Sequence, residues 1–204
     1  MTLIHPAYFA PISQYSVIAK AATIEFEVED NFQKQTYRNR CYINTSNGKL
    51  LLNVPIKHNK GVKQKTKDVR IDYKENWQLN HLKALKTAYS SSPFFEFYID
   101  DLLSIFESRH RFLIDLNFRC HDFIMESLQI QIPTSFSSEF LKNKEGDFRY
   151  LINAKTKTEF LFDRYIQVFE QENGFISNLS ILDLIFMEGP NALNYLEQQN
   201  LSQF

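Results

Sequence analysis

The sequence predicts an α/β fold with a small, mostly parallel sheet, an N-terminal βαβ unit, a β-hairpin and a large helical section. Three observations predict it. Near the N-terminus, two β-prone runs flank a helical run, which is the order of a βαβ unit. Asn47-Gly48 then lies between two further β-prone runs, which is a strong short-range signal for a hairpin. From Asn76 onward, apolar residues recur at the three- and four-residue spacing of helices.

The βαβ unit begins with residues 2–5, a β-prone run that Pro6 stops because proline cannot donate to a strand ladder. Residues 12–22 are predicted to form a helix with Ser13 as its cap. Residues 23–30 alternate strictly, as a strand does. One face of this strand is apolar and the other is acidic: Ile24, Phe26 and Val28 oppose Glu25, Glu27 and Glu29.

The hairpin strands are expected over residues 37–44 and 49–56, joined by a turn at 45–48. A polar, lysine-rich segment over residues 57–67 follows, and we expect it to be a mobile surface loop. Residues 69–71 are compatible with one more short strand.

The helical section begins at Asn76, and its first helix carries a buried stripe that consists of Trp77, His81, Leu85 and Ala88. Pro93 suits the first turn of the next helix. The later elements are predicted as helices over 100–107, 111–128, 147–155, from Ser180 to Gly189-Pro190 and over 191–199, strands over 129–132 and 165–169, and a serine-rich connection over 134–139. We expect one domain over residues 1–204, mainly β with one helix in 1–72 and mainly helical in 73–204.

The composition excludes several classes of protein. The 204 residues carry 23 lysines and arginines against 24 aspartates and glutamates, whereas a nucleic-acid binder usually has a large basic excess. Neither a signal peptide nor a membrane span is expected, because no apolar run approaches the ~18 residues that a span needs. Cys41 and Cys120 fit no metal-ligand spacing, and we expect buried, reduced thiols in a cytoplasmic protein. The five glycines form no phosphate-binding loop.

Three residues near the N-terminus are the catalytic candidates. His5 ends the first predicted strand ahead of a helix, where α/β folds place their sites, although an ordinary loop histidine fits equally. Glu29 and Asp30 end the second predicted strand and are suited to act as a general base or to bind a sugar or metal. Alternatively, the glutamates of this strand are solvated or opposed by cations, because like charges on one face repel each other.

The densest group of directional hydrogen-bonding residues is Tyr37-Arg38-Asn39-Arg40. Arginine presents a planar fork that fits phosphate or carboxylate, so this group predicts binding of an anionic substrate. The alternative is that Arg38 and Arg40 pair with the glutamates across the sheet. Lys57 follows a predicted strand and either binds phosphate or is solvated with its lysine neighbours.

Three further side chains are candidates for shaping a pocket beside these groups: Tyr8, Trp77 and His81. A tryptophan and a histidine in a helix stripe are more often core residues than site residues, so both interpretations stay open. Most of the 19 phenylalanines lie in the second half of the chain, where we expect them to pack the helices.

Several motifs occur together in this chain. They are His5-Pro6-Ala7-Tyr8-Phe9, Phe32-Gln33-Lys34 leading into Tyr37-Arg38-Asn39-Arg40, Leu52-Asn53-Val54-Pro55-Ile56, Trp77 with His81, and Asn178-Leu179-Ser180-Ile181-Leu182-Asp183. In this combination the chain resembles the WbqC-like family over nearly its whole length. The resemblance implies association with the biosynthesis of surface polysaccharide and O-antigen in bacteria. It adds Lys34 to the substrate-binding candidates and implies no particular cofactor.

The residues and the resemblance favour a cytoplasmic, transferase-type enzyme that acts on a nucleotide-activated sugar or a related anionic metabolite. In this hypothesis Arg38 and Arg40 clamp phosphate or carboxylate. Glu29 or Asp30 orients hydroxyl groups or acts as a base, and His5 is the acid–base candidate. Two alternatives stay open: a non-catalytic binding or scaffolding module of an envelope-assembly pathway, and a nucleotidyltransferase-like enzyme. Convergence of the candidate residues on one cleft would favour an enzyme.

Overall fold

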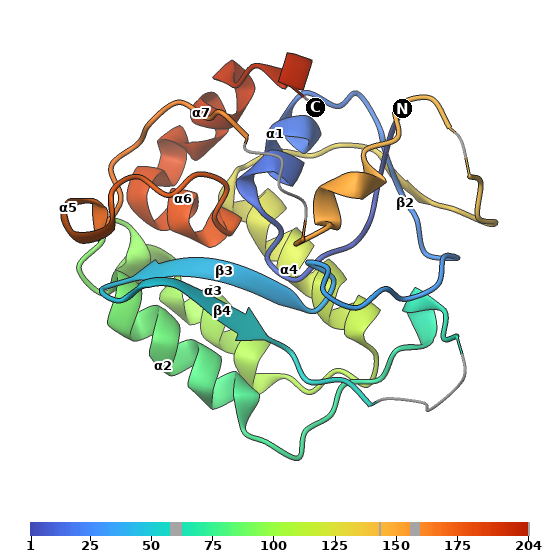
Figure 1. Ribbon diagram of the computed structural model, residues 1–204, viewed down its shortest axis with the longest axis horizontal. Coiled ribbons are helices and arrows are strands. Elements are labelled where there is room, and N and C mark those ends of the chain that lie inside the picture. Colours follow the sequence, from blue (N-terminus) through green and yellow to red (C-terminus); the bar gives the residue numbers. More distant parts are fainter. Residues whose placement is uncertain (58–62, 143, 156–159, 204) are drawn as a thin grey trace.

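A computed structural model describes residues 1–57, 63–142, 144–155 and 160–203 (Figure 1). The strands are β1 (Thr2–Ile4), β2 (Ile24–Phe26), β3 (Arg40–Thr45), β4 (Gly48–Asn53) and β5 (Thr134–Phe136). The α-helices are α1 (Ile12–Ala19), α2 (Trp77–Tyr89), α3 (Phe95–Glu107), α4 (Leu113–Ser127), α5 (Glu170–Asn173), α6 (Ile181–Glu188) and α7 (Ala192–Gln198). Short 3-10 helices are η1 (Thr66–Asp68), η2 (Arg149–Ile152), η3 (Gly189–Asn191) and η4 (Leu201–Gln203).

The parallel sheet has three strands of three residues each, in the order β1-β2-β5. β1 and β2 are parallel and are joined through α1, with Ile4 opposite Phe26, which confirms the predicted βαβ unit. β2 pairs in parallel with β5, with Ile24 opposite Thr134. The sheet is fixed in the core because Leu3 and Ile4 of β1 and Ile24 and Phe26 of β2 are buried.

The second predicted strand is shorter than its alternating pattern suggests. The N–H of Glu27 still donates to the carbonyl of Ile4 at 2.8 Å. The strand ends there because the following backbone N–H groups find side-chain acceptors in place of a ladder partner. Val28 N–H donates to Ser137 Oγ at 3.0 Å, and Glu29 N–H donates to Glu27 Oε1 at 2.8 Å. The chain therefore leaves the sheet just where its polar residues begin.

The third strand of the sheet lies after Pro133 and not before it, so the predictions of a strand over 129–132 and a connection over 134–139 are wrong. Pro133 has no N–H, but its carbonyl accepts a hydrogen bond from Ile24 N–H at 2.9 Å and starts the ladder. Gln129, at the end of α4, has a φ of +56° and turns the chain toward the sheet.

The alternating run at 165–169 is also not a strand. Tyr165 and Gln167 are buried, but Tyr165 donates its hydroxyl to Asp183, and Gln167 bonds to the backbone of Ile176. Burial of every second side chain therefore arises here without a strand partner in the described part of the chain. Residues 69–71 likewise make only isolated bridges.

The predicted hairpin is confirmed as the antiparallel pair β3 and β4, with Thr45 opposite Gly48 across a two-residue turn. Gly48 has a φ of +92°, which glycine adopts without the steric cost that a side chain brings. The hairpin packs on α2 and α6 through β3, whose Cys41 and Ile43 are buried. Together with the parallel sheet, it confirms the predicted fold class.

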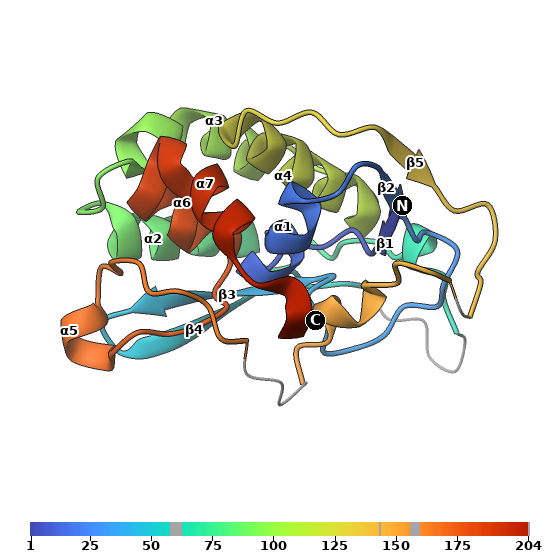
Figure 2. The same ribbon diagram turned by 90° about the horizontal axis from the view of Figure 1, so that it is seen from above.

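The helices α1–α4, α6 and α7 gather on one side of the hairpin, and α5 lies beside its end (Figure 2). α1 packs on α6 and α7, and α3 lies between α2 and α4. Buried phenylalanines fill the interior of this layer, as expected, and examples are Phe95, Phe106 and Phe123. Phe97 is an exception, with 77% of its surface exposed.

The helix α6 begins with a side-chain cap, whereas the cap predicted for α1 is wrong. Ser180 caps α6, because its Oγ accepts from the N–H of Leu182. Ser13 does not cap α1. Pro11 occupies the N-cap position, and the N–H of Ser13 donates to the side chain of Asn178 at 2.9 Å.

Three further expectations concern membrane-spanning helices, the two cysteines and the lysine-rich loop. None of the helices in the described ranges is long and apolar enough to cross a bilayer. Cys41 and Cys120 are buried, free thiols, as expected. Of the lysine-rich loop predicted over 57–67, residues 58–62 lie outside the described residues.

Candidate functional site

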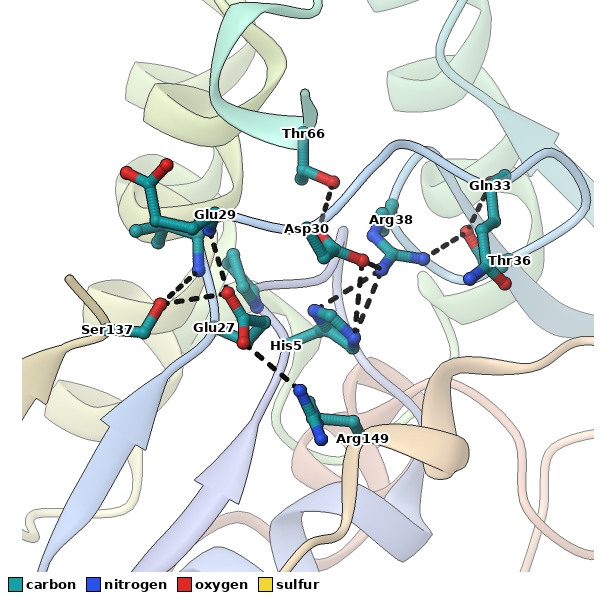
Figure 3. Close-up of polar contacts among 12 residues, drawn as sticks. His5, Glu27, Glu29, Asp30, Gln33, Thr36, Arg38, Thr66, Ser137 and Arg149 are labelled. Carbon is teal, nitrogen blue, oxygen red and sulfur yellow. Dashed lines mark hydrogen bonds and ion pairs between the residues drawn. The ribbon is translucent and has the colours of Figure 1, made fainter. Parts of the chain in front are cut away.

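The carboxyl ends of the three parallel strands meet in a buried polar cluster (Figure 3). His5 follows β1, Glu27 follows β2 and Ser137 follows β5, so the parallel arrangement brings them to one edge of the sheet. The polar cluster consists of His5, Glu27, Asp30, Arg38, Ser137 and Arg149. Ligand sites of open α/β sheets lie at this edge, which agrees with the predicted position of His5.

Arg38 joins His5 to Asp30 in the centre of the cluster. Its Nη2 lies 3.1 Å from His5 Nε2 and forms a salt bridge with the carboxylate of Asp30. Thr66 donates its hydroxyl to the other carboxylate oxygen at 2.6 Å. All three side chains are therefore held by partners within the chain.

Burial dominates the protonation of these three groups. Burial, followed by the positive charge of Arg38, lowers the pKa of His5 well below its usual range, so the imidazole is neutral near pH 7. Burial also raises the pKa of the Asp30 carboxyl group and lowers the pKa of Arg38, in each case against the charge of the partner. The salt bridge thus carries a large desolvation cost, which only the presence of both charges offsets.

Glu27 and Arg149 form the second ion pair of the cluster. Arg149 Nη1 donates to Glu27 Oε2 at 3.1 Å, and Ser137 donates its hydroxyl to Oε1 at 2.9 Å. Asp147 holds Arg149 in turn through Nε, at 2.9 Å, and Nη2, at 2.6 Å. The carboxylate of Glu27 therefore has a partner on each oxygen.

The other two glutamates of the predicted acidic face are also opposed by cations. Glu25 pairs with Lys144, and Glu29 pairs with both Lys65 and Lys67. Hydrogen bonds from these two lysines lower the pKa of Glu29. Of the alternatives for this face, opposition by cations is the one observed, but the cations come from later segments and not from the neighbouring arginines.

Tyr8, Trp77 and His81 meet in the core. The hydroxyl of Tyr8 lies 2.9 Å from His81 Nδ1, and the ring centroids of Trp77 and His81 are 5.2 Å apart. Burial lowers the pKa of His81 to about 4, while a hydrogen bond to the backbone of Asn53 opposes this shift. The neutral ring therefore donates to Asn53 and accepts from the hydroxyl of Tyr8.

Replacing Tyr8 with phenylalanine is expected to lower the free energy of unfolding by about 1–3 kcal/mol, because His81 Nδ1 would be buried without its donor. Urea unfolding followed by circular dichroism measures this loss. Tyr150→Phe is the matched control, since Tyr150 is exposed and its hydroxyl bonds to no other described residue. Equal stability of the Tyr8→Phe variant and the unmodified protein would contradict the assigned hydrogen bond.

Lys34, Asn39 and Arg40 line a surface cavity of about 410 Å³, which we call the Arg40 cavity. Its remaining lining residues are polar Gln35 and Asn53 and apolar Phe32, Pro55 and Ile56. Two cations and no carboxylate are present among these described lining residues. The cavity therefore favours a ligand with negative charge.

Two polar atoms of the Arg40 cavity have no hydrogen-bond partner among the described residues: Asn39 Oδ1 and Arg40 Nε. The amide nitrogen of Asn39 donates to Asn53 Oδ1 at 3.1 Å and to the carbonyl of Val54 at 3.0 Å, which fixes the amide and leaves its oxygen unused. A buried polar atom without a partner is costly, and both atoms are shielded from solvent, so a ligand would supply the missing partners only after a shift of the Asn39 or Arg40 side chain.

The remaining candidates lie elsewhere. Tyr37 is buried beside Tyr42, with ring centroids 6.1 Å apart, and burial raises its pKa to about 12, so the phenol stays neutral. Lys57 lines a second cavity together with Lys65 and Arg70.

The family follows from comparison with known proteins. The family model described as the WbqC-like protein family matches residues 6–160, which is most of the chain. The chain belongs to the WbqC-like protein family. This confirms the resemblance seen in the sequence. The matched range contains the Arg40 cavity and all of the polar cluster except His5.

One relative of this WbqC-like protein is the protein Rv1507c of Mycobacterium tuberculosis (strain H37Rv), whose name describes it as uncharacterized. The two are 28% identical in a comparison that extends over 202 residues. It covers 84% of this chain and 87% of the relative. No solved structure matches the chain.

The structure of this WbqC-like protein divides the predicted site residues into separate groups. It brings His5, Asp30 and Arg38 together in the polar cluster, and it brings the other candidates of the segment 34–40, except Tyr37, together in the Arg40 cavity. Tyr8, Trp77 and His81 form a third group in the core. The candidates therefore do not converge on one cleft.

Sequence reasoning missed Thr66, Ser137 and Arg149. Thr66 lies 36 residues from its partner Asp30, and Arg149 lies 122 residues from its partner Glu27, so no local spacing connects them. Of the three, only Arg149 could have been recognised from the sequence. It begins the mostly apolar run of η2, where an arginine must either pair with a buried anion or lie on an exposed face. Among the described residues, no group of three or more histidine, cysteine, aspartate or glutamate side chains is placed to hold a metal ion.

Proposed function

We propose that this WbqC-like protein binds a nucleotide-activated sugar or a related anionic metabolite in surface polysaccharide biosynthesis. Because the candidate residues do not converge on one cleft, a binding module of this pathway accounts for the structure directly, and a cytoplasmic, transferase-type enzyme is the second candidate function. The observation that carries the proposal is the Arg40 cavity, which combines two cations with a buried, unpartnered amide oxygen. Membership of the WbqC-like family supports the biosynthetic context that the resemblance implies.

Arg40 and Lys34 bind the anionic group of the substrate. The guanidinium of Arg40 offers a planar fork for phosphate or carboxylate, and it has no ion pair among the described residues. Lys34 is exposed and reaches the same cavity as a mobile point charge. An anion bound here meets cations that form no ion pair with a carboxylate of the described residues.

Asn39 makes the cavity selective for a hydrogen-bond donor on the ligand. Its Oδ1 accepts a hydrogen bond but cannot donate one, so it selects a hydroxyl or N–H group on the substrate and disfavours a second anionic oxygen. A sugar or a nucleoside presents both kinds of group, an anion at one end and hydroxyl groups near it. This combination fits the cavity better than inorganic phosphate does.

The polar cluster stabilises the loop that carries Lys34, one of the residues that line the Arg40 cavity. Asp30 lies at the start of the segment 31–37, and Arg38 lies at its end, so their salt bridge closes the loop that carries Lys34. Arg38 Nη1 also lies 3.4 Å from the hydroxyl of Thr36. His5 and Asp30 are the acid–base candidates from the sequence, with Glu29. The contacts of His5 and Asp30 support a positioning role instead, which preorganises the loop.

Replacing Arg40 with alanine is expected to weaken binding of UDP-glucose about ten- to a hundredfold, since a hydrogen bond to a charged group contributes about 1.5–3 kcal/mol. Isothermal titration calorimetry of the full chain measures the affinity, after a thermal-shift screen of nucleotide-sugars has ranked the probes. Lys34→Ala should weaken binding in the same direction.

Lys83→Ala is the matched control, because Lys83 is exposed on α2 away from the cavity. Its affinity should equal that of the unmodified protein. Unchanged binding by the Arg40→Ala variant, or a screen in which no nucleotide-sugar raises the unfolding temperature, would contradict the proposal.

A further inference from the structure

A second cavity, of about 700 Å³, adjoins the Arg40 cavity. Ile56 lines the first cavity, and the next residue, Lys57, lines the second. Phe32, in the first cavity, donates its N–H to the carbonyl of Gln64, in the second, at 2.8 Å. We call the second one the Lys57 cavity. Its other lining residues are Lys63, Lys65, Asp68, Arg70 and Phe112.

The Lys57 cavity concentrates positive charge. Four of its lining residues are cations, and Asp68 is the one carboxylate among the described lining residues. Lys65 is already neutralised by Glu29 at 2.5 Å. Lys57, Lys63 and Arg70 form no ion pair with any described residue. Three unpaired cations around one cavity repel each other, and a bound polyanion would relieve this repulsion.

Two of these cations are held by paired backbone. The N–H of Lys57 donates to the carbonyl of Arg70 at 2.8 Å, and Ile56 and Ile71 form an antiparallel bridge. Arg70 in turn bridges to Phe112. The backbones of Lys57 and Arg70 are therefore fixed relative to each other, and their exposed side chains start from neighbouring positions.

The aromatic ring of Phe112 adds a flat, apolar side to the cavity. The guanidinium groups of Arg70 and Arg111 lie 6.0 Å and 5.2 Å from its centroid. The two guanidinium groups lie over the ring, so a planar base that follows the anionic group of a ligand would meet the edge of Phe112 or would stack on a guanidinium plane.

We propose that the Lys57 cavity is a second anion site, distinct from the Arg40 cavity, and that it binds a diphosphate group. A monophosphate carries at most about two charges, fewer than the three unpaired cations, and it is small for the cavity. A diphosphate offers more charged oxygens and spans Lys57, Arg70 and Lys63. The inference uses none of the residues of the Arg40 cavity, so it goes beyond the proposed function.

Calorimetry of the full chain with inorganic pyrophosphate tests the site, and UDP is the second probe. We expect saturable binding of pyrophosphate that weakens at least tenfold in the double variant Lys57→Ala/Arg70→Ala and also weakens in Lys63→Ala. The control double variant Lys83→Ala/Arg109→Ala, which removes two positive charges at exposed positions elsewhere, should bind as the unmodified protein does. If UDP binds more tightly than pyrophosphate, and Phe112→Ala removes this difference, the diphosphate belongs to a nucleotide. If the two probes bind with equal affinity, the site recognises only the diphosphate.

Three outcomes would overturn the inference. They are the absence of saturable pyrophosphate binding at low salt, an equal loss in the control double variant, and a loss in Arg40→Ala alone. Lys57, Lys63 and Arg70 are exposed, so the variants should fold, and their unfolding temperatures verify this. If UDP-glucose loses affinity in Lys57→Ala/Arg70→Ala but not in Arg40→Ala, the second anion site stands and the proposed role of the Arg40 cavity fails.

Discussion

The Arg38→Ala variant is expected to lose about 3–5 kcal/mol of its free energy of unfolding, because the substitution leaves the carboxylate of Asp30 buried without its cation. Asp30 and Arg38 are 6% and 1% exposed, so water cannot replace the lost partner without opening the cluster. His5 loses the donor to its ring at the same time. Urea unfolding at neutral pH measures the change.

Arg40→Ala is the matched control for this variant. It removes the same side chain two residues further along the chain, where the guanidinium has no ion pair among the described residues, and it should change stability little. Adding Asp30→Asn to Arg38→Ala should recover part of the loss, because the buried charge is then gone. A loss below about 1 kcal/mol in Arg38→Ala would show that the salt bridge is not held as described.

The second large effect concerns Asp183, a fully buried carboxylate. It accepts hydrogen bonds from the hydroxyl groups of Tyr89 and Tyr165, each at 2.6 Å. Burial raises its pKa to about 6, and the two tyrosines oppose the shift. Its pKa in the unfolded chain is about 3.9, so the folded state holds the proton more tightly. The stability from this proton is fully present below about pH 3.9 and is lost as the pH rises through about 6.

The stability of the unmodified protein relative to Asp183→Asn should therefore fall by about 3 kcal/mol over the whole titration, about 2 kcal/mol of it between about pH 4.5 and about pH 7.5. Urea unfolding of both proteins at several pH values measures the difference. Taking the difference removes the contributions of the buried histidines, whose lowered pKa values act in the opposite direction. Asp101→Asn, exposed on α3, should give a flat difference, and a flat difference for Asp183→Asn would contradict the shift.

Sequence patterns over a few residues predicted the elements that depend only on interactions between neighbouring residues. The turn at Asn47-Gly48 and the inward stripe of α2 follow from backbone sterics and helical spacing, and both are present. The strand β5 could not be predicted in this way. It has three exposed residues and resembles a polar loop, and it is a strand only because β2 pairs with it from 110 residues away.

In the candidate site, too, residues could be predicted from local patterns, whereas the contacts between them could not. Lys34, Asn39 and Arg40 were all predicted as substrate-binding residues, and they line one cavity. Their grouping was not predicted, because alternation along a strand puts Arg40 on the face of Arg38 and Asn39 on the other face. The salt bridge between Arg38 and Asp30 was not predicted, although both residues were site candidates, because the expected partners of the arginines were the glutamates. Which acid a buried arginine meets depends on where the chain leaves the sheet, and no spacing along the chain encodes that.

The order of the strands has a consequence for biosynthesis of the chain. β1 and β2 leave the ribosome early, but Ser137 follows Glu27 by 110 residues and Arg149 follows it by 122. Until these residues emerge, the nascent chain holds an unpaired edge at β2 and an acidic side chain without its cation. Pairing across so long a separation is slow, because the entropy of closing the loop must be lost first. The polar cluster is thus assembled after the hairpin and α2–α4 have been synthesised, and its completion marks the late steps of folding.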